Sequence, residues 1–265
     1  MDKSKIVNRK STIKKTGTRE WAEENVNIQL GCEHDCRYCY ARSSAVRFKW
    51  TNRQSWSAPI INQQAVDKNY GKKRGIVMFP STHDITPGNY NECMVVILKL
   101  LDAGNQVLIV SKPNIECIEP MCERLVEYRQ QLEFRFTIGS TRDDVLKFWE
   151  PGAPGFEERL NCLKRAHFLN YLTSVSAEPY LDDGIEHLYT RCFPYITESF
   201  WIGTLRHFNR RVDRSAITVD QMYDFVTPLL ACQQPNPVRR LYEKLNGRPY
   251  IKWKDSVREM LSIDD

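Results

Sequence analysis

The sequence predicts an α/β fold: a partial (β/α)6 barrel of the TIM type, with a basic N-terminal arm and a C-terminal helical extension. Short β-rich segments alternate with longer segments of helical periodicity, which is typical of parallel β/α architectures. Several strands are continuous apolar runs, such as "GIVMFP" and "QVLIVSK", as expected when helices cover a parallel sheet. Six units rather than eight indicate that the barrel is incomplete.

The elements of this fold follow in chain order. Strands are expected at residues 26–30, 75–79, 106–111, 133–139, 172–177 and 200–205. Helices are expected at residues 89–103, before Gly104, from Glu119 with Pro120 in the first turn, and at residues 156–169. After residue 216 the pattern is helical through "VDQMYDFVTPLLA" and "PVRRLYEKL". We therefore expect an arm at residues 1–20, a barrel at residues 21–215 and a helical extension at residues 216–265.

Composition limits the class of protein. The 265 residues, 42% of them hydrophobic, are enough to bury a sizeable core. The formal net charge of +5 comes from residues 1–20, where seven basic residues face two acidic ones. We interpret this arm as a solvated tail or, alternatively, as a segment that contacts phosphates. The longest apolar run, Met94 to Leu98, is too short to cross a bilayer, so no membrane partner is expected.

The cysteines indicate a reducing compartment. Their number, nine, is odd, and the N-terminus lacks the pattern of a secretory signal. We therefore expect free thiols and a cytoplasmic location. Outside one cluster of three, the cysteines are scattered without metal-ligand spacing, and we interpret them as small buried side chains.

Three cysteines in "GCEHDCRYCYAR" carry the strongest chemical signal. Cys32, Cys36 and Cys39 lie in the loop after the first predicted strand, at the end of the barrel where active sites form. Thiolates at this spacing on an irregular loop suit an iron–sulfur cluster, and three ligands leave one iron open to a small molecule. The alternative is a structural zinc site completed by His34, which is poorly placed between Cys32 and Cys36 to join one tetrahedron.

This cysteine pattern, with Tyr38 before the last cysteine, resembles the signature of the radical S-adenosylmethionine (SAM) superfamily. The stretches "NIQLGCEHDCRYCYAR", "STHD", "SKP" and "EPGAPGFEERLNCLKRA" together resemble its spore photoproduct lyase branch. The resemblance implies a 4Fe-4S cluster on Cys32, Cys36 and Cys39, with SAM bound to the open iron. It also implies an enzyme that cleaves SAM reductively, abstracts hydrogen from a substrate and receives electrons from a flavodoxin or ferredoxin.

The resemblance also assigns cofactor contacts at the strand ends. The backbone near Tyr38 would contact the adenine, and Thr82 or His83 the methionyl amine. Lys112 would bind the methionyl carboxylate, and Ser140 would lie near the ribose. Each has an ordinary alternative: Lys112 can extend to the barrel rim, His83 can pair with Asp84, and Ser140, like Thr137, can serve a turn or cap.

The sequence departs from the branch at one position. Ser81 stands where the family has a hydrogen-donating cysteine, and a serine O–H bond is too strong for that role. Ser81 therefore argues against repair of the spore thymine dimer itself, whereas DNA repair or modification of another kind stays implied by the resemblance. Another donor, such as Cys192 or one of Tyr180, Tyr189 and Tyr195, could serve such a reaction.

The sequence leaves the substrate class open between a nucleic acid, a peptide or protein, and a small molecule. The basic arm and "RPYIKWK" would suit a nucleic acid, since cations contact phosphates and rings stack on bases. Glu150 in "EPGAPGFEER" is either part of a rigid loop or a contact to cofactor or substrate. The alternative function is a non-catalytic nucleic-acid-binding protein with a structural metal site.

Overall fold

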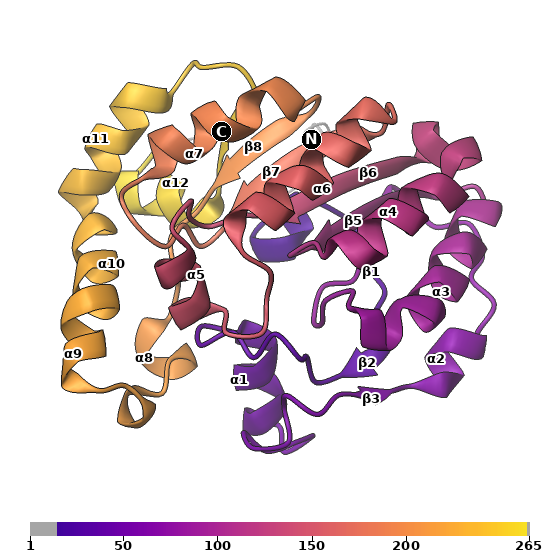
Figure 1. Cartoon of the computed structure of the whole chain (residues 1–265), viewed down its shortest axis with the longest axis horizontal. Coiled ribbons are helices and arrows are strands. Elements are labelled where there is room, and N and C mark those ends of the chain that lie inside the picture. Colours follow the sequence, from indigo (N-terminus) through magenta and orange to yellow (C-terminus); the bar gives the residue numbers. More distant parts are fainter. Residues whose placement is uncertain (1–14, 264–265) are drawn as a thin grey trace, which may run out of the picture.

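The computed structural model describes residues 15–263, which fold around a seven-stranded parallel sheet (Figure 1). The strands, in spatial order, are β1 (Glu24–Asn25), β4 (Ile76–Phe79), β5 (Gln106–Ser111), β6 (Leu132–Thr137), β7 (Leu172–Ala177), β8 (Ser199–Ile202) and β9 (Ile251–Trp253). Every neighbouring pair is parallel, from β1 with β4 to β8 with β9. Because β1 and β9 are the two edges of the sheet, the barrel is open, and the predicted partial barrel is confirmed.

Helices surround this sheet. They are α1 (Tyr40–Arg47), α2 (Gln63–Asp67), α3 (Tyr90–Asp102), α4 (Ile115–Arg124), α5 (Asp143–Trp149), α6 (Phe156–Phe168), α7 (Ile185–Cys192), α8 (Phe208–Arg211), α9 (Val219–Gln221), α10 (Thr227–Cys232), α11 (Pro235–Leu245) and α12 (Asp255–Leu261). Figure 1 shows α3, α4, α6 and α7 flanking the sheet along one side. None of the helices within residues 15–263 is both long enough and apolar enough to traverse a bilayer.

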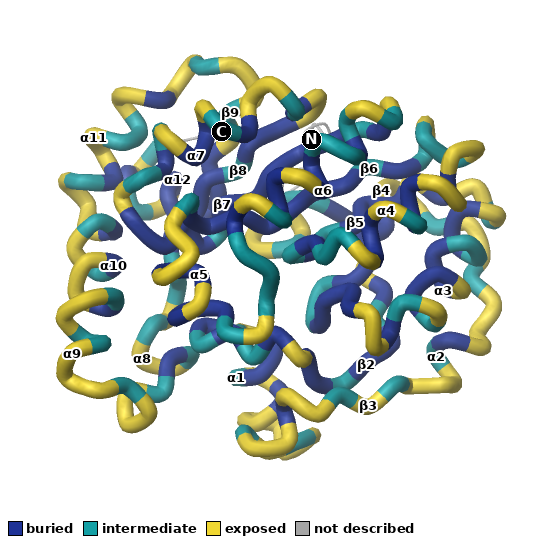
Figure 2. The backbone as a smooth tube through the Cα atoms, in the orientation of Figure 1, coloured by how far each residue is buried: buried dark blue, intermediate teal, exposed yellow. Residues whose placement is uncertain are grey.

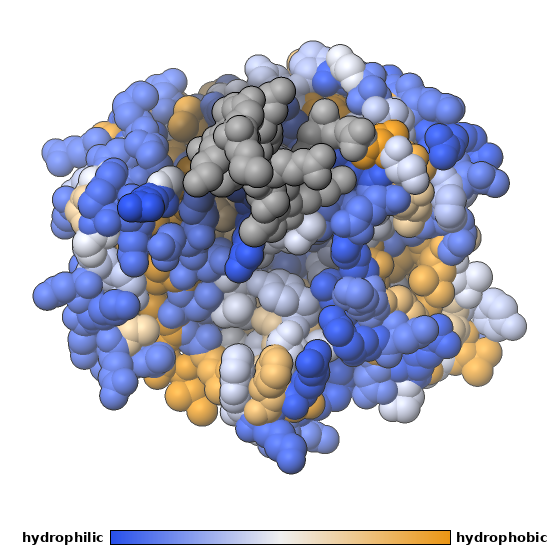
Figure 3. Space-filling view, turned by 180° about the vertical axis from the view of Figure 1, so that it is seen from behind, coloured by the Kyte–Doolittle hydropathy of each residue, from blue (hydrophilic) through white to orange (hydrophobic). Residues whose placement is uncertain are grey.

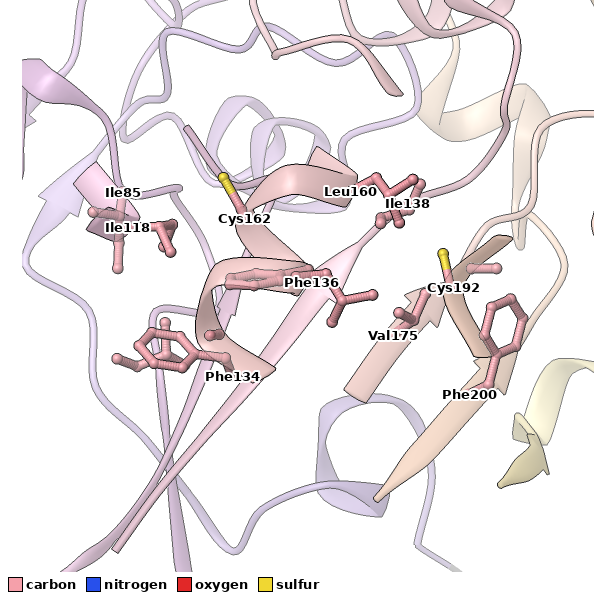
Figure 4. Packing of buried hydrophobic residues seen from close by; sticks show 14 of the residues in the cluster. Ile85, Ile118, Phe134, Phe136, Ile138, Leu160, Cys162, Val175, Cys192 and Phe200 are labelled. Carbon is pink, nitrogen blue, oxygen red and sulfur yellow. The ribbon is translucent and has the colours of Figure 1, made fainter. Parts of the chain in front are cut away.

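The strands separate an apolar outer layer from a polar interior. In β6, Phe134 and Phe136 are fully buried on the side that faces α4 and α6, close to Ile118 and Cys162 (Figure 4). Because side chains alternate along a strand, Thr137 points to the opposite side, into the barrel. The tube in Figure 2 is dark blue along the strands and yellow on the outer turns of the helices. The face seen from behind in Figure 3 is mostly hydrophilic, with separate hydrophobic areas.

The first predicted strand, residues 26–30, is wrong in its bounds. Glu24–Asn25 pairs with β4, and Val26 still donates to the carbonyl of Met78 at 3.0 Å. The chain then leaves the sheet, because the side chain of Asn27 accepts hydrogen bonds from the backbone of Ser81 (2.7 Å) and Thr82 (2.9 Å). The following β2 (Gln29–Leu30) pairs instead with the antiparallel β3 (Ile60–Ile61) and leads into the cysteine loop.

Two further predictions need correction. The helix expected from Glu119 begins at Ile115, where the side chain of Asn114 caps it, and Pro120 lies inside it. The sheet has seven strands instead of the six expected, because Ile251–Trp253, in the predicted helical extension, pairs with β8 as the last strand. The division into arm, barrel and extension stays a prediction. Most of the basic arm lies outside the described residues, namely Lys3, Lys5, Arg9, Lys10 and Lys14.

Candidate active site

A cavity of about 570 Å³ opens at the carboxyl ends of β4 to β7. It contains most of the residues that the sequence singled out, together with polar side chains from the strand ends. Among its lining residues are Cys32, Cys36, Tyr38, Cys39, Thr82, His83, Asp84, Lys112, Thr137, Ser176, Glu178 and Arg211. Ligands bind at this end of parallel sheets because loops from several strands converge there.

The three cysteines are held by an ordered loop. Cys32 donates its backbone N–H to the carbonyl of Trp56 at 2.9 Å, and Cys39 caps α1 by accepting from the N–H of Arg42 at 3.4 Å. Gly31 has φ +98°, and a Cβ there would lie 2.7 Å from the carbonyl oxygen of Trp56. Only glycine fits this turn, so the approach to the first cysteine is fixed by the backbone.

The "EPGAPG" stretch supports this loop. The N–H of Gly152 donates to the carbonyl of His34 at 3.0 Å, and the N–H of Arg37 donates to the carbonyl of Trp149 at 2.8 Å. A Cβ on Gly152 would lie 2.3 Å from the carbonyl oxygen of Glu33. The stretch after α5 therefore packs directly on the backbone between the cysteines.

The cysteine side chains fit an iron–sulfur cluster. Cys32 and Cys36 are buried and Cys39 is partly exposed, and all three reach the same cavity. Burial raises the pKa of Cys32 to about 12 and that of Cys36 well above its usual range, so metal binding must displace their protons. Within residues 15–263, no three cysteine, histidine or carboxylate side chains converge as a single ion would require. A cubane offers a separate iron to each thiolate, so its ligands need not meet at one point.

A buried carboxylate, Glu150, contacts Tyr38, which lies between Cys36 and Cys39. It is fully buried, and its Oε2 lies 2.6 Å from Nη1 of Arg159, which is also fully buried. The hydroxyl of Tyr38 donates to the other oxygen, and Nζ of Lys112 lies 3.9 Å from it. Burial alone would raise the pKa of Glu150, but Arg159 and Lys112 lower it below its usual range. Glu150 is therefore ionised and fixes Tyr38 beside Cys39.

A second buried carboxylate, Asp84, connects the strand ends. Its Oδ2 lies 3.2 Å from Nδ1 of His34 and accepts the backbone N–H of Lys112 at 2.9 Å, and the hydroxyl of Ser111 donates to Oδ1. Burial opposes ionisation, but His34, Lys112 and Ser111 lower the pKa of Asp84 to about 2. Asp84 thereby connects the cysteine loop with the ends of β4 and β5.

Comparison with known proteins identifies the family. A sequence model of the radical SAM superfamily matches residues 26–181, more than half of the chain. This chain belongs to the radical SAM superfamily. Membership implies that it binds SAM and an iron–sulfur cluster.

Two relatives of this radical SAM protein carry no assigned function. The uncharacterized protein ORF301 of Acidianus two-tailed virus is 26% identical over 171 residues, which are 60% of this chain and 55% of that protein. The uncharacterized protein MJ0683 of Methanocaldococcus jannaschii is 24% identical over 165 residues, 61% of each chain. The chain thus spans little more than half the length of these relatives.

Solved structures confirm the radical SAM fold. A spore photoproduct lyase variant with bound AdoMet and dinucleoside spore photoproduct superposes with a TM-score of 0.55 at 15% identity, covering 92% of this chain and 79% of that one. SuiB of Streptococcus suis bound to SAM gives 0.52 at 9% identity, covering 88% of this chain and 50% of that one. At these identities the likeness concerns the fold alone.

The radical SAM cavity brings together most of the predicted cofactor contacts. Tyr38, Thr82, His83 and Lys112 line it with the cysteines, whereas Ser140 is not among the described residues that line it. The hydroxyl of Ser140 donates to Asp182 and accepts the N–H of Arg142 at 2.8 Å, which is turn chemistry before α5. Its predicted contact with the ribose therefore lacks support from this geometry.

The ring of His83 is already engaged. Its Nε2 accepts the N–H of Ile28 at 3.1 Å, and its Nδ1 lies 3.0 Å from the carbonyl of Asp84. Burial lowers the pKa of His83, which favours the neutral ring. Backbone atoms thus occupy both ring nitrogens of His83.

Lys112 is one of the cations that line the cavity, with Arg19, Arg206 and Arg211. Burial alone would lower its pKa, but Cys36, Glu150 and Asp84 raise it above its usual range, so the ammonium stays charged. Glu150 is 3.9 Å away and already paired with Arg159 at 2.6 Å. The ammonium is thus available to an anionic ligand.

Several residues in or next to this cavity have no role assigned by the sequence. Asp84, Glu178 and Arg211 line the cavity, and Arg159 is buried next to it against Glu150. Arg159 could have been noted as an arginine on the apolar face of its helix, beside Leu160 and Leu163. The others had no local signal, because only the fold brings them to the cysteines.

Proposed function

We propose that this radical SAM protein is an enzyme that holds a 4Fe-4S cluster on Cys32, Cys36 and Cys39 and abstracts hydrogen from its substrate. When bound and reduced, the cluster would cleave SAM to a 5′-deoxyadenosyl radical, with the electron supplied by a flavodoxin or ferredoxin. One observation carries the proposal: the three cysteines share a cavity with a charged lysine and polar strand ends. A closed structural metal site would have no use for such a cavity.

The residues of the cavity support specific tasks. The ammonium of Lys112 would pair with the methionyl carboxylate, and Thr82, on the neighbouring strand end, would accept the amine. The hydroxyl of Tyr38 donates to Glu150, which holds this segment of the loop in place. The backbone near Tyr38 would then face the adenine. The apolar walls of Met78 and Val110 would exclude water from the reacting atoms.

The proposed substrate is a nucleic acid that the enzyme repairs or modifies. The stretch "RPYIKWK" offers less support than its composition suggested, because Lys254 is fully buried, Trp253 is 7% exposed and Arg248 pairs with Glu186 at 3.0 Å. The spore photoproduct lyase of similar fold was solved with a dinucleoside in place. All nine cysteines are free, which supports a reducing, cytoplasmic setting.

Anaerobic reconstitution tests the enzyme proposal. We expect about four irons per chain, a brown protein, and 5′-deoxyadenosine after addition of SAM and dithionite. Cys36→Ala should abolish both iron binding and SAM cleavage, whereas Cys232→Ala, in α10 away from the cavity, should leave both intact. A colourless protein with one tightly bound zinc would instead favour the non-catalytic binding protein, and a Cys36→Ala variant that still cleaves SAM would contradict the assignment of the cluster to this cysteine.

A further inference from the structure

A groove lined by arginines lies beside the catalytic cavity. It has a volume of about 690 Å³ and is formed by α1, the loop after it and the segment around α8. Six arginines line it: Arg42, Arg47, Arg53, Arg210, Arg211 and Arg214. Asp213 is the one carboxylate among its described lining residues. The groove is therefore a concentrated positive surface.

Most of this positive charge is not neutralised. Nη1 of Arg42 lies 2.6 Å from Asp35, and Nε of Arg53 lies 3.3 Å from Asp213. The remaining four arginines have no carboxylate at ion-pair distance within residues 15–263: Arg47, Arg210, Arg211 and Arg214. Clustered cations of this kind repel one another and attract anions. The planar guanidinium binds phosphate oxygens in pairs, which favours a phosphate ligand.

The groove adjoins the cavity. Arg211 lines both of them. Along α1, Tyr40 and Ala41 line the cavity, and the next residues, Arg42 and Ser43, line the groove. A ligand lying in the groove can therefore extend a reacting group towards the cysteines. A small substrate could be bound by the cavity alone, so a groove of about 690 Å³ next to it favours a larger substrate.

Two exposed aromatic rings stand at the end of α1. The rings of Phe48 and Trp50 stack with their centroids 5.4 Å apart and their planes 27° apart. They are 53% and 66% exposed, and the guanidinium of Arg47 lies 5.0 Å from the Phe48 ring. Neither ring lines the groove itself, but Arg47 connects the two, and exposed rings next to cations suit single strands, since bases stack on rings while phosphates contact cations.

We infer that this groove binds the phosphate backbone of a single-stranded nucleic-acid segment, with the Phe48 and Trp50 rings stacking on its bases. The inference rests on the proposed function, because the nucleotide next to the bound segment would occupy the catalytic cavity. It assigns substrate binding to α1 and α8, which the sequence did not single out. Four unpaired arginines, one of them shared with the cavity, carry this assignment.

A matched pair of double variants tests the groove. Arg210→Ala with Arg214→Ala removes two groove cations, and Arg239→Ala with Arg240→Ala removes two exposed cations from the distant α11. Binding of a labelled single-stranded oligonucleotide to the reconstituted enzyme is measured by fluorescence anisotropy over a range of salt concentrations. The groove variant should bind about ten-fold more weakly and reduce the salt slope by about 1.4, or about 0.7 per lost phosphate contact. The α11 variant should match the wild type.

The aromatic pair has its own test. Trp50→Ala should weaken binding of the same oligonucleotide about ten-fold without changing the salt slope, because stacking is not ionic. The control is Tyr223→Ala, which removes another aromatic ring that is 72% exposed. Duplex DNA and nucleoside triphosphates serve as competitors, and each should displace the strand poorly.

Several outcomes would overturn the inference. Equal weakening by the two double variants would make the groove a generic cationic surface, and efficient competition by triphosphates would make it a small-molecule site. Slower reduction of the cluster by an acidic flavodoxin, with strand binding unchanged, would assign the groove to the electron donor.

A parallel measurement separates this inference from the proposed function. Cleavage of SAM by the reconstituted enzyme is followed with dithionite as the reductant and without nucleic acid. If it persists while strand binding is absent, the inference fails and the proposed enzyme stands; if cleavage is absent in the wild type, the proposed function itself fails.

Discussion

At the scale of single residues, the site depends on buried charges with fixed partners. Glu150 connects Arg159 with Tyr38 and, more distantly, with Lys112. Replacing one partner of a buried ion pair leaves an uncompensated charge in a medium of low dielectric constant. The network around Glu150 should therefore be more sensitive to substitution than ion pairs on the surface.

Glu150→Gln tests this network. The variant keeps the side-chain shape but leaves the fully buried Arg159 without its counter-charge, so the free energy of unfolding in urea should fall by about 3 kcal/mol. The control is Glu157→Gln, which removes the partner of Arg191 from a pair with 60% and 38% exposed side chains. Exposed pairs contribute less than about 1 kcal/mol. Equal losses in both variants would show that Glu150 is not held as an ion.

The difference in stability between the wild type and Glu150→Gln has a defined pH dependence. Because the pKa of Glu150 is lowered in the folded state, its ionised form adds stability above the unfolded pKa of about 4.3. That contribution is lost as the pH falls through the lower folded-state pKa. The difference in unfolding free energy between wild type and Glu150→Gln should thus be constant near neutral pH and shrink below about pH 4.

The sequence predicted the cysteines but not this network. Metal-ligand spacing is a local property, so Cys32, Cys36 and Cys39 could be assigned from one short stretch. Glu150 and Tyr38 are 112 positions apart, and only the fold brings them together. The role of Ser140 stays a prediction, because a polar residue at a strand end can serve a turn as well as a ligand, and its hydroxyl bonds Asp182 and the N–H of Arg142.

At the scale of elements, strand prediction depended on how much of each strand is buried. The bounds of Gln106–Ser111 and Leu172–Ala177 agree with the sequence prediction, since the first contains a continuous apolar run and the second, though rich in Ser and Thr, is a mostly buried central strand. β9 is three residues long and includes Lys252, so nothing in its composition distinguishes it from a helix end. Its assignment comes from pairing with the free edge of β8, which is a tertiary interaction.

The contact between two loops makes an element-scale prediction. Gly152→Ala would place a Cβ 2.3 Å from the carbonyl oxygen of Glu33 and 2.9 Å from Cα of His34. Because both neighbours are backbone atoms, the cysteine loop must shift, at a cost of about 1–3 kcal/mol in unfolding free energy. The iron content after reconstitution should fall as well. Gly71→Ala is the control, since its Cβ would meet nothing within 4 Å, and a normal iron content in Gly152→Ala would contradict the proposed support.

At the scale of the whole molecule, the open sheet is joined through its two chain ends. β1 and β9 do not pair, yet the segments next to them meet at Lys254, which is fully buried after β9. Its ammonium lies 2.7 Å from Glu20 and 3.3 Å from Glu178, and it donates to the carbonyl of Gly17 at 2.8 Å. The ring of Trp21 lies beneath it, 4.1 Å from the ammonium to the centroid.

This connection also forms part of the cavity wall. Gly17, Trp21 and Glu178 line the cavity, so the N-terminal segment at residues 16–21 closes the side that an eight-stranded barrel would close with further strands. Lys254 follows β9 and contacts Gly17 and Glu20, so it connects this part of the cavity wall to the last strand of the sheet. Loss of that cation should loosen the N-terminal segment more than the central strands.

Lys254→Met tests whether the chain ends are coupled in this way. Methionine preserves the volume but removes the ammonium shared by Glu20 and Glu178, and within residues 15–263 only Glu20 keeps a cation, Arg258 at 2.7 Å, so the unfolding free energy should fall by about 3 kcal/mol. Hydrogen exchange followed by mass spectrometry should show lost protection at residues 17–22, with β5 and β6 changed only by the global loss of stability. Lys244→Met is the control, because its partner Glu186 is at the surface and the side chain of Lys244 is 58% exposed. Unchanged exchange at residues 17–22 in Lys254→Met would mean that the N-terminal segment is held by its own packing, and that the open side of the barrel is closed without this buried cation.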